Sequence, residues 1–368
     1  MRSLRCGVPA ALLLVLTLAL TSCAAANGPT ATEKPNATAN PASSSPLACD
    51  DLLSPAAVGT ALTGIDGVAP ALVEAVQPSY AVQEALLTGA GGLVCSWRVG
   101  EGQLTIGAGQ GDWAYLSVEV LPDAATDWVP PYLGDAPSNV QRTVAQITAT
   151  TTSGENGWRI SAPVGSAWVD VRVTSSGLMS GESRFQGVPS GSVLDGMMPA
   201  AEATFTAITT ATVDQMSWPK LPFRAGDARC DGGLDQQGIQ DALQLGGAPV
   251  EYKVSDSREG TVYALADAVA ARIGVFTCSM FAEGFGYTDI TVIRDFTPVI
   301  DELKTMPDMA SALEPITLEG SVEGETALQA RRADGPHSPL YFTLGQTLYG
   351  ISSDGPATVA EAIIAQTR

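Results

Sequence analysis

Apolar and polar residues alternate through the middle of each half of the chain, and this pattern predicts antiparallel strands. From Trp168 to Thr174, Val169 and its alternate neighbours are apolar, whereas Asp170 and Arg172 are charged. The predicted strands are Leu104–Ala108, Leu116–Leu121, Gln146–Thr151, Arg159–Val164, Trp168–Thr174, Ile290–Arg294, Ile316–Val322, Thr326–Arg331, Tyr341–Leu344 and Thr347–Ser352. Because the two faces of these strands differ in polarity, we expect meander sheets with one face buried and the other in water.

Helical patterns precede and follow each set of strands. Ser54 and Pro55 are typical of a helix start, with a side-chain cap followed by proline in the first turn. Further helices are predicted at Tyr80–Leu87, Ala200–Thr210, Tyr263–Ile273, Thr297–Met306 and Ala357–Gln366. The predicted fold class is therefore α+β, with two tandem two-layer domains, each an antiparallel meander sheet packed by N-terminal and C-terminal helices.

The two halves of the chain repeat one another. The stretch from Cys49 to Trp97 aligns with that from Cys230 to Met280 with one two-residue insertion. Aligned pairs include Val58 with Ile239, Leu62 with Leu243, Tyr80 with Tyr263, Ala85 with Ala268 and Cys95 with Cys278. The duplication predicts a first domain over residues 47–214, a proline-containing connector over 215–226 and a second domain over 227–368.

The first 22 residues have the pattern of an export signal. Arg2 and Arg5 precede an apolar run that is short for the roughly 30 Å hydrocarbon layer, which disfavours a permanent transmembrane helix. The segment Leu-Thr-Ser-Cys at 20–23 resembles the lipobox of bacterial lipoproteins, and this resemblance implies a diacylglycerol on Cys23. An ordinary secretory signal is the alternative. Residues 23–46 then form the lipidated end and a flexible tether of roughly 26 Å reach, which places the protein at the outer face of the cytoplasmic membrane.

Charge limits the classes of partner. The chain has 39 Asp and Glu against 19 Lys and Arg, and its formal net charge is -20. Nucleic-acid binding needs a positive surface, so a nucleic-acid partner is not expected, and adhesion to anionic headgroups is disfavoured as well. The membrane is therefore a predicted partner only through the lipid anchor at Cys23, and the acidic balance keeps an exported protein soluble.

The cysteines that remain after the signal and Cys23 form one pair in each repeat. Cys49 is 46 positions before Cys95, and Cys230 is 48 positions before Cys278. Because an exported protein folds in an oxidising compartment, we expect the disulfides Cys49–Cys95 and Cys230–Cys278. A zinc site is the competing interpretation, but the chain has no Cys-x-x-Cys and a single histidine.

Motifs of known enzymes and cofactor sites are poorly matched, so no cofactor or metal is expected. The glycine-rich segment 107–111 fits a hairpin better than a nucleotide-binding turn, and the Ser-x-x-Lys match at 217–220 is interrupted by Pro219. His337, in a turn, leaves no Ser-His-Asp arrangement. Carboxylates are plentiful, including Asp50, Asp51, Asp231 and Asp235, but nothing in their spacing selects an acid and base pair.

Two tryptophans are candidates for a binding surface. Trp97 shares a strand face with Cys95, and because its repeat partner is Met280, core packing is the better interpretation. Trp168 falls on the polar side of its strand, with Asp170 and Arg172, which makes it a possible exposed binding residue. Its burial beneath a loop or the closing helix is the better interpretation.

The lipobox, the polar tether, the Cys-Asp-x-x-Leu start and the Cys-Ser-Trp strand together resemble small putative lipoproteins of actinobacteria whose repeated domain has no assigned function. The resemblance implies a cell-surface lipoprotein and transfers no catalytic residue. We expect a non-enzymatic protein that binds an envelope component or a partner protein. An envelope hydrolase using paired carboxylates and a structural spacer are the alternatives.

Replacing Cys23 by Ala is expected to release the protein into the medium without lipid, because no other residue of the lipobox-like segment carries a thiol. Intact mass and the membrane-bound fraction measure this. A Cys23→Ala chain that still carries acyl mass would contradict the assignment.

Overall fold

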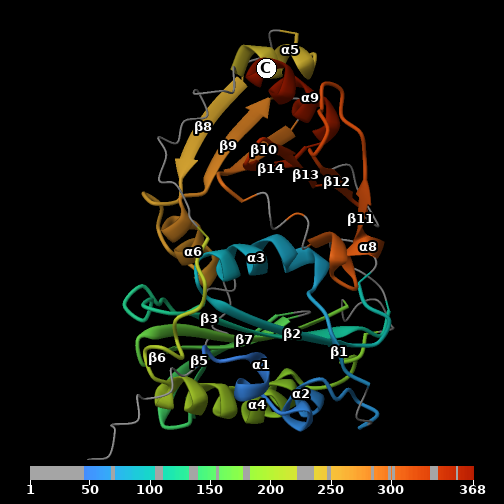
Figure 1. Ribbon diagram of the computed structural model, residues 1–368. Helices are drawn as coiled ribbons and strands as arrows, with labels where there is room; N and C mark the ends of the chain where they lie inside the picture. The colour runs from blue at the N-terminus through green and yellow to red at the C-terminus, as the bar shows by residue number, and fades with distance from the viewer. Residues whose placement is uncertain are drawn as a thin grey trace, which may run out of the picture. The chain divides into compact units, whose positions relative to one another are not determined.

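Two antiparallel sheets of seven strands each form the framework of the described part of the chain (Figure 1). The computed structural model describes residues 45–67, 71–103, 111–131, 140–154, 157–176, 183–221, 236–246, 250–282, 286–296, 300, 303–331, 339–353 and 355–368. This confirms the α+β class with one sheet in each half. The division into separate domains remains a prediction.

The first sheet has the strand order β1-β2-β3-β7-β6-β5-β4. Its strands are β1 (Val73–Glu74), β2 (Leu93–Val99), β3 (Ala114–Leu121), β4 (Val140–Val144), β5 (Ile147–Ser153), β6 (Gly157–Val164) and β7 (Ala167–Ser175). Starting at one edge of the sheet, the chain forms β1, β2 and β3 in order. It then crosses to the opposite edge and forms β4, β5, β6 and β7 towards the middle. The sheet is completed where β7 pairs with β3.

The second sheet has the same order, β8-β9-β10-β14-β13-β12-β11. Its strands are β8 (Val250–Asp256), β9 (Phe276–Ala282), β10 (Gly286–Ile293), β11 (Leu313–Pro315), β12 (Ala327–Ala330), β13 (Leu340–Leu344) and β14 (Thr347–Ser352). Cys278 pairs with Ile290 in the second sheet as Cys95 pairs with Val118 in the first. The duplication read from short sequence blocks therefore extends to the order of all seven strands.

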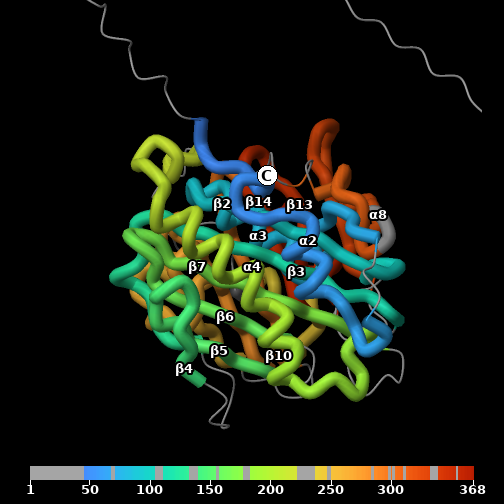
Figure 2. Tube along the Cα trace, turned by 90° about the horizontal axis from the view of Figure 1, so that it is seen from below, coloured from blue at the N-terminus to red at the C-terminus, as the bar shows by residue number. Residues whose placement is uncertain are grey.

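Helices cover both faces of the first sheet. Helix α4 (Ser190–Thr210) lies across the strands on one face, together with α1 (Cys49–Leu52) and α2 (Pro55–Ala61) (Figures 1 and 2). The turn η1 (Pro78–Tyr80) and helix α3 (Ala81–Gly89) lie on the opposite face. As predicted, Ser54 caps α2, and its hydroxyl accepts a hydrogen bond from the Ala57 amide at 3.3 Å.

The second half has a matching set of helices. Helices α5 (Gln236–Ala242) and α9 (Pro356–Thr367) pack against each other, and α9 contacts β13 and β14. Helix α6 (Leu265–Ile273) occupies the sequence position that α3 has in the first half, and α8 (Met309–Ala312) precedes β11. Buried residues of α3 and α6 belong to one hydrophobic cluster.

The first hydrophobic core lies between the sheet and α4. Trp97, Val118 and Val171 point into it from the strands, and Met197 and Phe205 point into it from the helix. Burying a side chain of this size contributes roughly 1.5–3 kcal/mol. The predicted core role of Trp97 is confirmed, and Met280 is buried in the corresponding core of the second half.

A disulfide joins Cys49 of α1 to Cys95 of β2, as predicted. Cys278 is buried on β9 and is disulfide-bonded. Cys230 lies outside the described residues, so the pairing Cys230–Cys278 stays a prediction. Other predictions also fall outside the described part of the chain. They concern Cys23, His337, the predicted strand Leu104–Ala108 and all but the last residue of the glycine-rich segment 107–111.

Three expectations about the sheets are wrong. The strands do not form simple meanders, because β3 pairs with β7 and β10 pairs with β14. The polar faces of β3 and β7 are not in water, since every residue of both strands is buried. The strand predicted at Ile316–Val322 is instead the short β11 just before it. Strands β1 and β4 have too little apolar alternation to be recognised from sequence, whereas β8 does alternate, through Val250, Tyr252 and Val254, and was missed.

No helix in the described ranges has both the length and the apolar content needed to cross a bilayer.

Removing the Cys49–Cys95 disulfide with Ala at both positions is expected to lower the free energy of unfolding by up to about 4 kcal/mol. The bond closes a loop with a sequence separation of 46, and opening it raises the entropy of the unfolded chain. Urea unfolding of the double variant measures this. A loss below half a kcal/mol would show that the bond is not a structural constraint.

Candidate functional site

A row of polar side chains crosses the face of the first sheet that lies under α3. The strand pairing places Thr152 of β5 opposite Arg159 of β6, Arg159 opposite Arg172 of β7, and Arg172 opposite Ser117 of β3. Residues opposite one another on neighbouring strands point to the same face. Two arginines therefore stand side by side on a covered face, where like charges are unfavourable without compensation.

Arg172 is the centre of a buried ionic network. Its Nη2 atom lies 3.1 Å from Glu84 Oε1 and 2.7 Å from Glu119 Oε1, and its guanidinium carbon lies 3.8 Å from the ring centroid of Tyr80. Ser96 donates a hydrogen bond to the other Glu84 oxygen at 2.9 Å. The network thus ties α3, through Glu84 and the adjacent Tyr80, to β2, β3 and β7.

Burial sets the protonation of this network. The pKa of Glu84 is raised to about 8, chiefly by burial and to a smaller extent by the negative Glu119, while Arg172 and the hydrogen bond from Ser96 oppose the shift. Burial by itself would lower the pKa of Arg172, but Glu119 and Glu84 more than offset this and raise that pKa. At neutral pH Glu84 therefore holds a proton for most of the time, and Glu119 is the carboxylate that balances Arg172.

The second arginine is less tightly held. Arg159 Nη1 lies 3.5 Å from Asp170 Oδ2, and about a quarter of the Arg159 side chain is exposed. Asp170 also accepts a hydrogen bond from Trp168 Nε1 at 3.0 Å. Because Asp170 is shared in this way and its contact with Arg159 is long, Arg159 keeps donor capacity for a further anion.

The favoured interpretation that Trp168 is buried is confirmed, and its candidacy as an exposed binding residue is wrong. The side chain is 1% exposed, and its Nε1 donates to Asp170 and, at 3.2 Å, to Ser161. Trp128 Nε1 donates to the same Ser161 hydroxyl at 3.0 Å. Trp168 lies on the same strand face as Asp170 and Arg172 because its ring nitrogen takes part in this buried hydrogen-bond network. The side chain presents no aromatic surface to solvent.

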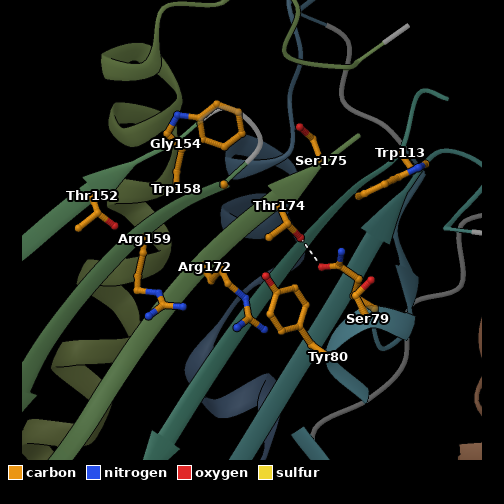
Figure 3. A pocket seen from close by; sticks show the side chains of 12 residues that line it. Ser79, Tyr80, Trp113, Thr152, Gly154, Trp158, Arg159, Arg172, Thr174 and Ser175 are labelled. Carbon is orange, nitrogen blue, oxygen red and sulfur yellow. Dashed lines mark hydrogen bonds between the residues drawn. The ribbon is translucent and has the colours of Figure 1, made fainter. Parts of the chain in front are cut away.

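A cavity of about 350 Å³ opens over the two arginines. Figure 3 shows Arg159 and Arg172 extending in the same direction from neighbouring strands, with the Tyr80 ring beside Arg172. The cavity is lined by Gln77, Ser79, Tyr80, Trp113, Thr152, Gly154, Gly157, Trp158, Arg159, Arg172, Thr174 and Ser175. Guanidinium, hydroxyl, amide and aromatic groups thus surround one space.

Several polar atoms of the lining are unpartnered. Among the described residues, Arg172 Nη1 and Thr152 Oγ1 are buried and have no hydrogen-bond partner. Thr174, in contrast, donates to the Gln77 side-chain oxygen and so holds that wall in place. A buried unpartnered donor costs about 1–3 kcal/mol, and a bound molecule or water that accepted a hydrogen bond from it would recover this. The lining is therefore suited to a molecule with hydrogen-bond acceptors.

The remaining sequence candidates do not come together at this cavity. Asp51 accepts a hydrogen bond from the Ala48 amide at the start of α1, and Ser217 donates to the Val213 carbonyl. Trp218 is buried and donates to the Leu47 carbonyl at 2.8 Å, so the Ser-x-x-Lys match is part of a packed connector. Asp231 and Asp235 lie outside the described residues. No group of three or more His, Cys, Asp or Glu within the described ranges could hold a metal.

The sequence does carry a signal for the arginine pair, although it was missed. Strands β6 and β7 are joined by the two residues Gly165 and Ser166, and Gly165 has a positive φ of 59°. A two-residue hairpin turn fixes the register of its strands, and counting back from it places Arg159 opposite Arg172. Glu84 and Glu119 have no comparable local signal, because helix packing and the pairing of β3 with β7 bring them to Arg172.

The fold and the site define a class: an α+β protein of two sheets with the same strand order, and a cavity lined by two arginines between the first sheet and the η1 turn. Comparison with models of protein families, with curated proteins and with solved structures found no match.

Replacing Glu84 by Gln is expected to make stability less sensitive to alkaline pH. The folded-state pKa of about 8 exceeds the ordinary 4.5, so the contribution of Glu84 is complete below pH 4.5 and is lost as the pH rises through 8. Gln cannot ionise, so the stability of the variant relative to the parent should increase from pH 5 to pH 9. Urea unfolding across this range measures the difference.

The exposed Glu202 on α4 provides the control. Glu202→Gln should follow the parent at every pH. Parallel curves for Glu84→Gln and the parent would show that Glu84 does not titrate with a raised pKa.

Proposed function

We propose that this protein is a lipid-anchored binding protein of the cell envelope, and that its first half binds a small organic anion. The observation that carries the proposal is the pair Arg159 and Arg172, set side by side beneath one cavity, with an unpartnered nitrogen on Arg172. The ligand would carry a carboxylate or phosphate group. No catalytic step is required of the site.

The charges near the cavity support an anionic ligand. Glu119 and Asp170 contact the two arginines from one step along the strands, but the described lining of the cavity contains Arg159 and Arg172 and no Asp or Glu. A carboxylate or phosphate between the guanidinium groups would accept charge-assisted hydrogen bonds from both arginines. Each such bond contributes roughly 1.5–3 kcal/mol, so two of them supply about 3–6 kcal/mol. Binding tighter than millimolar therefore also needs the other groups of the lining.

The aromatic and hydroxyl groups of the cavity support a ligand larger than an inorganic ion. Trp113 packs edge-on against Tyr115 with ring centroids 5.6 Å apart, so the wall that Trp113 forms is fixed before binding. Ser79, Thr174 and Ser175 add polar groups around the same space. A preformed, mixed lining of this kind is typical of sites for small organic molecules.

The location completes the proposal. The lipid on Cys23 and the tether over 23–46 would hold the head near the outer face of the cytoplasmic membrane, where it would meet solutes of the envelope. We further propose that residues 47–214 and 227–368 are separate domains, each packed by N-terminal and C-terminal helices. The organism would be an actinobacterium, as the resemblance of the leader and the repeats implies.

Replacing Arg159 by Gln is expected to weaken anion binding at least tenfold, because one charge-assisted hydrogen bond is lost while the position stays polar. The probes are succinate, citrate and glycerol 3-phosphate, titrated by calorimetry into the full chain carrying Cys23→Ala. Arg142→Gln is the matched control, since Arg142 lies on β4 and pairs with Asp195 away from the cavity.

The proposal is rejected if none of the three probes binds, or if Arg142→Gln weakens binding as much as Arg159→Gln does. A native mass spectrum of protein purified without denaturation complements the titration. An anion of discrete mass that is present in the parent and absent in Arg159→Gln would identify the ligand class directly.

A second candidate is an envelope hydrolase that uses paired carboxylates, and one observation favours it. Burial raises the pKa of Glu84 to about 8 with Glu119 close by, and a carboxyl group of raised pKa beside a second carboxyl group is typical of acid and base pairs. Against it, Glu84 and Glu119 both contact the same nitrogen of Arg172. A substrate would have to displace Arg172 before it could reach both carboxyl groups. Recovery of a cleaved rather than an intact ligand, abolished by Glu84→Gln, would favour the hydrolase.

A further inference from the structure

The second sheet has a face equivalent to the arginine row, with different chemistry. Asp289 pairs with Ser352 between β10 and β14 at the ladder position where Ser117 pairs with Arg172. One step further, Thr291 pairs with Gly350 where Glu119 pairs with Asp170. Ser352 and Gly350 therefore replace Arg172 and Asp170, and both charged groups that β7 places on this face are missing from β14.

A cavity of about 420 Å³ lies over this face, beside α6. Its walls are mainly apolar and come from three places: Val82 and Leu86 on α3, Val269 on α6, and Ile293 and Leu348 on the sheet. Gly350 adds no side chain to the floor, and a Cβ built there would lie 3.4 Å from the Tyr341 ring. The missing side chain at Gly350 is one reason why the space is open.

Two polar groups face this apolar space. Asp289 accepts a hydrogen bond from Ser279 through Oδ1 at 2.6 Å, and among the described residues nothing donates to its Oδ2. The Tyr341 hydroxyl likewise has no hydrogen-bond partner within the described ranges, and burial raises the pKa of Tyr341 to about 12. Asp267 also lines the cavity, but its Oδ2 already accepts from the Tyr263 and Ala264 amides at the start of α6.

The lining of this cavity has the opposite charge to the lining of the cavity over Arg159 and Arg172. Asp289 and Asp267 are its charged residues, and the described residues of the lining include no Lys, Arg or His. A carboxylate beside an apolar space favours a ligand that brings a positive charge and apolar surface together.

We propose that the cavity over the second sheet is a separate binding site for a small apolar amine. The ammonium group donates to Asp289 Oδ2, the Tyr341 hydroxyl accepts a further hydrogen bond, and the hydrocarbon part lies among Val82, Leu86, Val269, Ile293 and Leu348. The proposal is independent of the anion site, since it uses different residues and a ligand of opposite charge. The duplicated fold would then carry two sites whose specificities have diverged.

The probes are phenethylamine and octylamine, with 3-phenylpropionate and 2-phenylethanol as analogues of reversed and of zero charge. Each is titrated by calorimetry at neutral pH into the full chain carrying Cys23→Ala. The amines should bind, and Asp289→Asn should weaken them at least tenfold, because it removes the charge and keeps the shape. Asp214→Asn, at an exposed position just before the connector, is the matched control and should change nothing.

A second variant protects the test against a folding defect at Asp289. Gly350→Val fills the floor of the cavity and should abolish binding of both amines, while Arg159→Gln should leave amine binding unchanged. The proposal is overturned if neither amine binds, if 2-phenylethanol or 3-phenylpropionate binds as well as phenethylamine, or if amine binding is lost in Arg159→Gln. Because anion binding is measured separately, failure of either site can be recognised without affecting the other.

Discussion

The buried guanidinium of Arg172 is the interaction on which the first half of the molecule depends. It is held by Glu84 from α3 and Glu119 from β3, so one side chain fixes a helix onto a sheet whose facing surface is polar. Removing one partner from such a network leaves an unpaired charge in a dry environment, which costs several kcal/mol. The orientation of Tyr80 and the charge of the cavity lining both depend on the position of this one group.

The second half shows what the same fold does without that group. Ser352 occupies the Arg172 position, and α6 is held against its sheet by apolar side chains such as Val269 and Ile293. The order of strands is nevertheless the same in both sheets. The architecture is therefore specified by the hydrophobic cores and the strand pairing, and the face beneath α3 and α6 is free to differ between the copies.

The sequence was informative where local rules apply and misleading where the fold overrides them. The alternation in β7, the cap at Ser54 and the cysteine spacing correctly indicated a strand, a helix start and the Cys49–Cys95 disulfide. Alternation could not show that the polar face of β7 is covered, because the helix that covers it comes from a distant part of the chain. The cavity was likewise beyond prediction, since Tyr80 reaches Arg172 only once α3 has packed on the sheet.

The pairing of β3 with β7 also has a kinetic meaning. Each sheet consists of two sequence-local blocks, three strands and then four, and they join only along this one seam. Glu84 and Glu119 belong to the first block of the first sheet and Arg172 to the second, so before the seam closes the carboxylates lack their cation. Pairing between distant segments is slow because loop closure precedes any gain in contacts. Pairing of β3 with β7 is therefore the folding step that joins the two blocks of strands into one cooperative unit.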